Sequence, residues 1–173
     1  MDDAAVAGLY RRHVPPLRGF AYLLTGGDHA LAEDLVHDAF IRTAGRMPSL
    51  RDPDAFEAYL RRSLINAFRS WQRRRVVERR WLARQSPMSQ SQAQWQAQSQ
   101  AQSIESVEAD DEVVRRLRTL PPRQRLAVAA RVCLDLSEAQ TAELLGCSVG
   151  TIKSLTSRGL ATLRKFEEVD VRP

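Results

Sequence analysis

The sequence predicts an all-α protein made of two small helical domains joined by a flexible linker. Apolar residues recur at helical spacing in most segments outside residues 85–105, and this period is typical of amphipathic helices. Residues 85–103 are rich in Gln, Ser and Ala, and such a segment has too little apolar surface to offset the entropy of ordering it. We therefore expect domains at residues 1–84 and 106–168, with the linker at 85–105.

Three helices are expected in the first domain. Residues 3–24 have helical spacing of apolar groups, but Pro15 and Pro16 should break or kink this segment because proline lacks the backbone donor. A Thr-Gly-Gly-Asp turn leads to an amphipathic helix over residues 30–46. A loop with two prolines follows, and a long helix is expected from about residue 54 to residue 84.

The second domain is expected to contain a helix-turn-helix. Helices over residues 106–119 and 122–134 should precede it. Ser137 is suited to cap the first helix of the motif, and Gly146 is suited to the turn because glycine enters the left-handed region without steric cost. Ser148 should cap the second helix. The apolar residues of this second helix form one row, which consists of Ile152, Leu155, Leu160, Leu163 and Phe166.

The polar face of that second helix is suited to a DNA major groove. It lacks carboxylates and offers short donors and acceptors, which match base edges flanked by phosphates. The residues of this face are Thr151, Lys153, Ser154, Ser157 and Arg158. An ordinary helical hairpin with a solvated face is the alternative, and the acid-free face favours DNA binding over it.

Basic charge is concentrated in two segments of a chain whose net charge is +5. Residues 61–84 contain 9 Arg and one Glu, and residues 113–173 contain 11 basic and 6 acidic residues. Residues 85–112 contain 5 acidic residues and no basic one. Concentrated basic charge is typical of a surface that binds a polyanion.

The composition argues against several classes of protein. Cys133 and Cys147 are the two cysteines, and neither has a partner at metal-ligand spacing, so we expect small packing residues in a reduced setting and, as a remote alternative, a redox switch. The apolar runs are too short to span a membrane and no signal peptide is visible, which predicts a cytoplasmic protein without membrane contact. The sequence offers no nucleophile–base pair and no glycine-rich phosphate loop. We therefore expect no enzymatic activity, no metal and no cofactor.

Three stretches of the chain together carry a family resemblance. The first is Ala-Tyr-Leu-Leu-Thr-Gly-Gly-Asp with Ala-Glu-Asp-Leu-Val-His-Asp-Ala-Phe, within residues 21–40. The second is Ala-Tyr-Leu-Arg-Arg-Ser-Leu-Ile-Asn at 58–66, followed by Trp71 and an Arg run. The third is Leu-Pro-Pro-Arg-Gln-Arg at 120–125 with Gly-Thr-Ile-Lys-Ser at 150–154. In this order they resemble regions 2.1–2.2, 2.3–2.4 and 4.1–4.2 of the extracytoplasmic-function (group 4) sigma factors of bacterial RNA polymerase, in particular a SigE-like subgroup common in actinobacteria.

The resemblance implies a promoter-specificity subunit that binds core RNA polymerase and directs transcription initiation at −10/−35 promoters. It implies docking on a coiled coil of the largest polymerase subunit and on the flap region, with a cognate anti-sigma factor as a further partner. The core-binding surface would combine a hydrophobic anchor with an acidic rim. The residues that match it are Asp34, Leu35, Val36, Asp38 and Phe40.

The same resemblance assigns two DNA-binding surfaces. Capture of the melted −10 strand needs a base pocket, a stacking group and cations along the backbone, and the matching residues are Phe56, Tyr59, Arg61, Arg62, Asn66, Arg69, Arg73 and Arg74. The duplex −35 element would be read by Ser148, Thr151, Lys153, Ser154, Ser157 and Arg158, with Arg123, Arg164 and Lys165 on phosphates. Leu155 and Ser70 depart from the family pattern, which usually has Arg at the first position and often Asp at the second.

Two other classes of protein remain as alternatives. A stand-alone helix-turn-helix regulator would bind duplex operators without polymerase, and it would need a dimerisation surface. Nothing in residues 1–84 resembles a ligand-sensing domain or a coiled coil. An adaptor would bind partners through its N-terminal helices with only incidental DNA contact.

Overall fold

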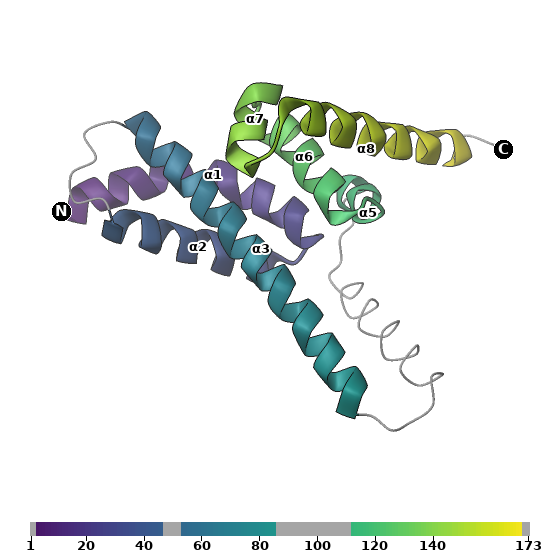
Figure 1. The fold of residues 1–173 in the computed structure, drawn as a ribbon. Helices are drawn as coiled ribbons and strands as arrows, with labels where there is room; N and C mark the ends of the chain where they lie inside the picture. Colours follow the sequence, from purple (N-terminus) through teal and green to yellow (C-terminus); the bar gives the residue numbers. More distant parts are fainter. Residues whose placement is uncertain (1–2, 47–52, 86–111, 171–173) are drawn as a thin grey trace.

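The computed structural model of the chain describes residues 3–46, 53–85 and 112–170, and these residues form helices and short connections (Figure 1). The predicted all-α class is confirmed, and the described helices lie within the predicted segments to within about two residues at the ends that can be compared. The first residues of the helix predicted at 106–119 lie outside the described residues. The helices are α1 (Asp3–Thr25), α2 (His29–Arg46), α3 (Pro53–Gln85), α5 (Glu112–Arg118), α6 (Pro122–Cys133), α7 (Glu138–Leu145) and α8 (Val149–Asp170).

The sequence predicts that Pro15 and Pro16 break or kink this segment, but helix α1 continues through both, so the break is wrong. The missing N–H groups leave the carbonyls four residues earlier without helical partners, and those carbonyls belong to exposed residues that water can reach. Val14 and Leu17, on either side of the proline pair, are buried against the neighbouring helices. Burial on both sides of the pair therefore outweighs the local cost of the prolines.

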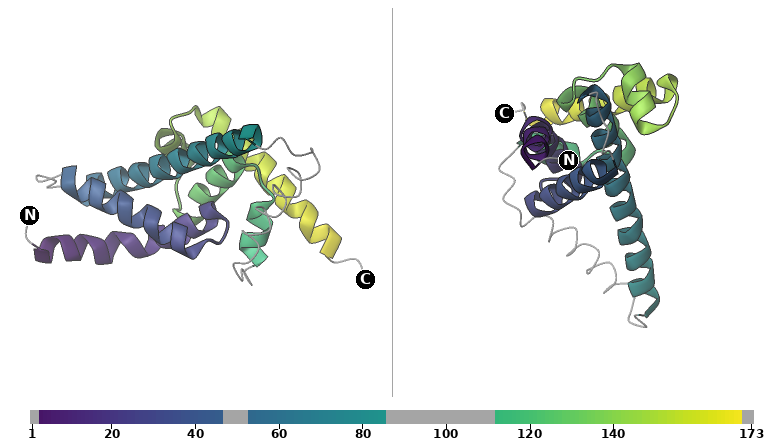
Figure 2. Two further views of the ribbon diagram at one scale, coloured as in Figure 1. Left: turned by 90° about the horizontal axis from the view of Figure 1, so that it is seen from below. Right: turned by 90° about the vertical axis from the view of Figure 1, so that its left-hand side faces the viewer.

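One hydrophobic core runs through both halves of the chain. It is built around Phe20, Leu60 and Ile65 of the first three helices, and the same cluster continues into Ala127 of α6 and Ile152 of α8. Helix α6 packs on α1, and α7 packs on α3 (Figures 1 and 2). The two halves that the sequence predicts as separate domains thus lie against each other, while nearly all of the predicted linker lies outside the described residues.

Two arginines form hydrogen bonds across the seam, by which we mean the contact between helices α1–α3 and helices α5–α8. Arg125 donates from Nη1 to the carbonyl of Leu24 at 3.4 Å, and Arg69 donates from Nη2 to the carbonyl of Leu145 at 2.8 Å. Burial lowers the pKa of the Arg125 guanidinium, and the charge of Arg118 lowers it further. A guanidinium nevertheless stays charged in proteins, so the seam contains a partly desolvated cation.

The helix-turn-helix forms for local reasons that the sequence predicts correctly. The N–H of Gln140 donates to Ser137 Oγ at 3.1 Å, and the N–H of Ser137 donates to Gln140 Oε1 at 2.8 Å. This reciprocal capping box satisfies two donors at the start of α7. Gly146 ends α7 with φ at 65°, in the left-handed region that glycine enters without penalty.

Substitution of Ser137 by alanine should destabilise the protein by about 1 kcal/mol, because it removes the side-chain half of the capping box. Urea unfolding followed by circular dichroism measures this change. Ser157→Ala, at an exposed position of α8, is the matched control and should change the stability by less than about 0.5 kcal/mol. Equal midpoints for the two variants would show that the capping box does not support the fold.

Helix α8 crosses α6 at Gly159, where the two helices approach closely. A Cβ atom at this position would lie 2.7 Å from Val128 Cγ2, which is closer than real Cβ contacts. Around the same crossing, Leu117, Leu120 and Val128 form a second buried cluster. The absence of a side chain at Gly159 therefore sets how α8 lies on α6.

Candidate nucleic-acid and polymerase interfaces

Helix α8 presents the predicted DNA-reading row to solvent. Thr151, Lys153, Ser154, Ser157 and Arg158 are all exposed, and at about 100° per residue they occupy less than half of the helix circumference. The opposite side carries Ile152, which is fully buried. Arg123, Arg164 and Lys165, the residues expected on phosphates, are exposed as well.

Part of this row also stabilises the start of α8. The N–H of Thr151 donates to Ser148 Oγ at 3.2 Å, and the two hydroxyl oxygens lie 2.9 Å apart. Lys153 Nζ lies 3.8 Å from Glu138 Oε2 of α7. Leu155 is half-buried against the core, so it lies outside the polar row. Phe166, the last residue of the predicted apolar row, lies beyond the side chains that the structure describes.

Helix α3 carries an exposed aromatic residue and several exposed cations. Tyr59 is 58% exposed, and the exposed polar residues near it and further along the helix are Arg62, Asn66, Arg73 and Arg74. Phe56, in contrast, is buried, with its ring 5.9 Å from that of Phe40. It lies on the side of α3 that faces the core, so it presents no surface to a nucleotide in this structure.

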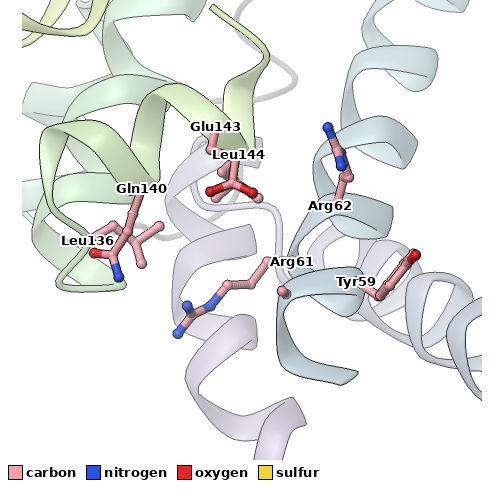
Figure 3. A pocket seen from close by; sticks show the side chains of 8 residues that line it. Tyr59, Arg61, Arg62, Leu136, Gln140, Glu143 and Leu144 are labelled. Carbon is pink, nitrogen blue, oxygen red and sulfur yellow. The ribbon is translucent and has the colours of Figure 1, made fainter. Parts of the chain in front are cut away.

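Arg61 and Arg69 face the seam. Arg61 forms an ion pair with Glu57 one turn earlier, and Arg69 binds the carbonyl of Leu145. Between α3 and α7 lies a groove of about 350 Å³, and Arg61 and Tyr59 leave α3 on opposite sides of the helix (Figure 3). The residues that line the groove are Ala58, Tyr59, Arg61, Arg62, Leu136, Gln140, Glu143 and Leu144.

The predicted hydrophobic anchor on α2 needs a correction. Leu35, Val36 and Phe40 are 7%, 1% and 4% exposed, because this row of α2 packs between α1 and α3. They present no apolar surface to a partner in this structure. The exposed large apolar residue of α2 is Ile41, at 55%, and the sequence interpretation did not include it in the binding surface.

The acidic part of the predicted surface does face solvent. Asp34 and Asp38 are exposed, and at about 100° per residue both lie within about 60° of Ile41 around the helix. Residues at i, i+4 and i+7 share one face of a helix. Asp34, Asp38 and Ile41 have this spacing, so the sequence contained the signal that could have identified Ile41. Asp38 also forms an exposed ion pair with Arg42, at 3.2 Å.

A cavity of about 390 Å³ lies between the C-terminal part of α2 and the first half of α3. Its lining contains three guanidinium groups, one exposed phenol and three smaller polar side chains. The residues are Arg42, Thr43, Arg46, Tyr59, Arg62, Ser63 and Asn66. The sequence interpretation included neither Arg42 nor Arg46 in a binding surface.

The two cysteines do not have the predicted packing role, because Cys133 and Cys147 are both exposed. Partial burial raises the pKa of the Cys133 thiol, so this thiol stays protonated at neutral pH. Among the residues that the structure describes, no three His, Cys, Asp or Glu side chains converge as a metal site would require. None of the described helices has both the length and the apolar content needed to cross a membrane.

Fold and surfaces together define a helical nucleic-acid-binding protein, with a helix-turn-helix in one half and an arginine-rich helix carrying an exposed aromatic residue in the other. Residues 9–77 match the family described as Sigma-70 region 2. Residues 110–163 match the family described as Sigma-70, region 4. The two matches follow each other in the order that the sequence motifs predict.

Individual relatives agree with these family matches. The chain is 34% identical over 136 residues to the RNA polymerase sigma-E factor of Streptomyces coelicolor, covering 78% of this chain and 70% of the relative. It is 30% identical over 165 residues to the ECF RNA polymerase sigma factor SigM of Mycobacterium tuberculosis, covering 95% and 78%. The chain belongs to the extracytoplasmic-function sigma factors, the promoter-specificity subunits of RNA polymerase.

A solved structure of a relative has the same overall arrangement. The sigma factor RpoE of Bartonella quintana, in complex with the anti-sigma factor NepR, matches with a TM-score of 0.71 and 26% sequence identity. The match covers 95% of this chain and 97% of the RpoE chain. The match therefore extends over both halves of this chain.

Proposed function

We propose that this chain directs core RNA polymerase to promoters by using three helices for three tasks. Helix α2 binds the polymerase, α3 captures the melted −10 strand, and α8 reads the −35 duplex. Residues 1–84 and 106–168 would supply the two functional domains. The observation that carries the proposal is the distribution of exposed groups, with acids on α2, arginines and Tyr59 on α3, and an acid-free polar row on α8.

The polymerase-binding surface would be centred on Ile41 and edged by Asp34 and Asp38. An exposed apolar residue beside charges is the usual composition of an interface centre and its rim. The partner that fits this surface is the basic coiled coil of the largest polymerase subunit, which the family resemblance implies, while residues of the second half would meet the flap region. Acidic rim residues would mainly accelerate association and select the partner.

The chain would supply specificity and no catalytic chemistry, and it would act in the cytoplasm together with the polymerase. On the −35 duplex, each base contact by Ser154, Ser157 or Arg158 would be worth about 1–3 kcal/mol of discrimination. Arg73 and Arg74 of α3, together with Arg123 of α6, would hold phosphates.

An anti-sigma factor is the proposed regulatory partner. The similarity to a sigma factor solved together with an anti-sigma factor supports this proposal. The groove between α3 and α7 supports it as well, because both halves of the chain line it. A partner in that groove would hold the two halves together and cover Arg61 and Arg62.

Run-off transcription with purified core polymerase and a library of promoter fragments tests the proposed function. Template-specific transcripts should appear only when this protein is added. A protein that retards duplex fragments alone, and that adds no transcripts to core polymerase, would instead be a stand-alone regulator.

Variants of α2 test the polymerase-binding surface separately. Ile41→Ala should weaken core binding at least about tenfold, as expected for truncation of a residue at the centre of an interface. The Asp34→Asn/Asp38→Asn double variant should slow association, most strongly at low salt. Glu33→Gln, an exposed neighbour on α2, is the control, and affinities equal to that control would contradict the surface. Surface plasmon resonance on immobilised core polymerase gives both rates.

A further inference from the structure

A carboxylate from helix α7 reaches the acid-free polar row of α8. Glu138 Oε2 lies 3.8 Å from Lys153 Nζ, and the two helices pack against each other (Figure 1). Among the residues that the structure describes, no other carboxylate forms an ion pair with this row. Lys153 and Arg158 are the two cations of the row. Glu138 therefore offsets one of the two positive charges that the row offers to DNA.

The start of α7 holds the backbone of Glu138 in place. Glu138 is the first residue of α7 and directly follows Ser137, whose capping box fixes the start of the helix. Thr141 and Ala142, about one turn later, are buried. The side chain of Glu138 is 37% exposed, whereas that of Lys153 is 64% exposed. The carboxylate is thus the more enclosed partner of the pair, and Lys153 stays accessible to DNA.

The ion pair matters for binding rather than for stability, because exposed pairs of this kind contribute little to the fold. An ammonium group has three donors, so Lys153 can bind Glu138 and a neutral acceptor on a base edge at the same time. A phosphate oxygen in the same place would bring a second negative charge close to the Glu138 carboxylate, and like charges repel. The pair therefore favours a base contact by Lys153 over a phosphate contact.

We propose that Glu138 is a specificity-determining residue for the −35 element, and that it acts through Lys153 by penalising complexes in which Lys153 meets only phosphate. The inference rests on the proposed function of α8. Binding without sequence preference is almost entirely electrostatic, so a carboxylate at the edge of the row weakens it more than it weakens binding to the correct sequence. Specificity is a difference of affinities, and it rises when the wrong complex is made less favourable.

The test uses holoenzyme reconstituted from core polymerase and the full chain. Its affinity is measured for a promoter from the run-off screen and for the same promoter with a scrambled −35 motif, at several salt concentrations. All contacts outside the −35 element are common to both templates, so the ratio of the two affinities reports −35 discrimination. Glu138→Gln should lower this ratio at least about threefold, mainly by tightening binding to the scrambled template. The salt slope on that template should steepen by about 0.9, the value of one additional phosphate contact on duplex DNA.

Three further variants separate this role from a general effect of charge or of folding. Glu143→Gln removes an exposed carboxylate from the same helix, but Glu143 lines the groove between α3 and α7 instead, so the ratio and the slope should not change. Glu138→Asp keeps the charge and should keep most of the discrimination. In a Lys153→Ala background, Glu138→Gln should have no further effect, because Glu138 acts through Lys153. Thermal unfolding verifies that each variant is folded.

The failure of this inference differs from the failure of the proposed function. Equal ratios for Glu138→Gln and Glu143→Gln would refute the role of Glu138 while the sigma-factor function stands. A loss of discrimination that persists in the Lys153→Ala background would refute it as well, since the carboxylate would then act on DNA directly. If wild-type holoenzyme transcribes but binds both templates equally, α8 does not read the −35 element, and the inference fails with that assignment. If the wild-type chain adds no transcripts to core polymerase, the proposed function itself fails.

Discussion

Substitution of Ile152 by alanine is expected to lower the free energy of unfolding by about 2–5 kcal/mol. The side chain is fully buried, so truncation removes apolar contacts and leaves a cavity in a core that can only partly relax. A domain of this kind has only about 5–15 kcal/mol of total stability, so the loss is a large fraction of it. Ile152 belongs to the hydrophobic cluster that runs through both halves. The whole protein should therefore unfold at a lower denaturant concentration.

Chemical unfolding monitored by circular dichroism measures the effect of Ile152→Ala. Val149→Ala is the matched control, because Val149 is a partly exposed apolar residue at the start of the same helix. The control should cost less than about 1 kcal/mol, as expected for a position already in contact with solvent. Similar losses for both variants would contradict the position of Ile152 in the shared core. Affinity for −35 duplex should also fall for Ile152→Ala, since this residue anchors the helix whose polar row is proposed to read that duplex.

Substitution of Arg125 by alanine is the second large effect, with an expected loss of about 1.5–3 kcal/mol. Arg125 donates to the carbonyls of Leu24, Arg118 and Leu120 at 3.4, 3.0 and 3.3 Å. Truncation leaves these partly buried acceptors without their donor, and that penalty exceeds the value of an ordinary hydrogen bond. Removing the desolvated charge, whose pKa burial lowers, offsets part of the loss.

Two comparisons make the Arg125 prediction specific. Arg123→Ala removes an exposed arginine from the same helix and should change the stability by less than about 0.5 kcal/mol. Arg125→Lys keeps the charge but lacks the planar fork, so it should recover only part of the loss. Small-angle X-ray scattering should report a larger radius of gyration for Arg125→Ala than for Arg123→Ala. Equal radii and stabilities would show that Arg125 does not hold the seam.

Local signals predicted the helices and the helix-turn-helix well, because the physics that forms them is local. Ser137 and Gly146 act on neighbours within a few residues, and both were identified from their residue type and position. The proline pair in α1 misled the prediction, since a local rule competed with burial against other helices. The contacts across the seam had no local signal, because the hydrogen bonds of Arg69 and Arg125 join residues 76 and 101 positions apart.

The exposure of the proposed binding residues was predicted correctly on α8 but only in part on α2. The polar row of α8 follows from helical phase, and the structure presents all of it to solvent. On α2, the interpretation from the family resemblance placed Leu35, Val36 and Phe40 in the binding surface as a hydrophobic anchor, and the structure buries all three. A family resemblance predicts which segment binds a partner. Tertiary packing determines which side chains of that segment are exposed and can contact the partner.

Gly159 lies on the side of α8 that packs on α6, away from the polar row that is proposed to read DNA. The crossing with α6 depends on the missing side chain at Gly159 and on Val128, on the side of α8 away from Ser154 and Ser157. Substitutions in the polar row therefore leave the crossing of α8 and α6 unchanged. Under the proposed function, substitutions in the polar row could therefore change promoter preference without changing how α8 lies on α6.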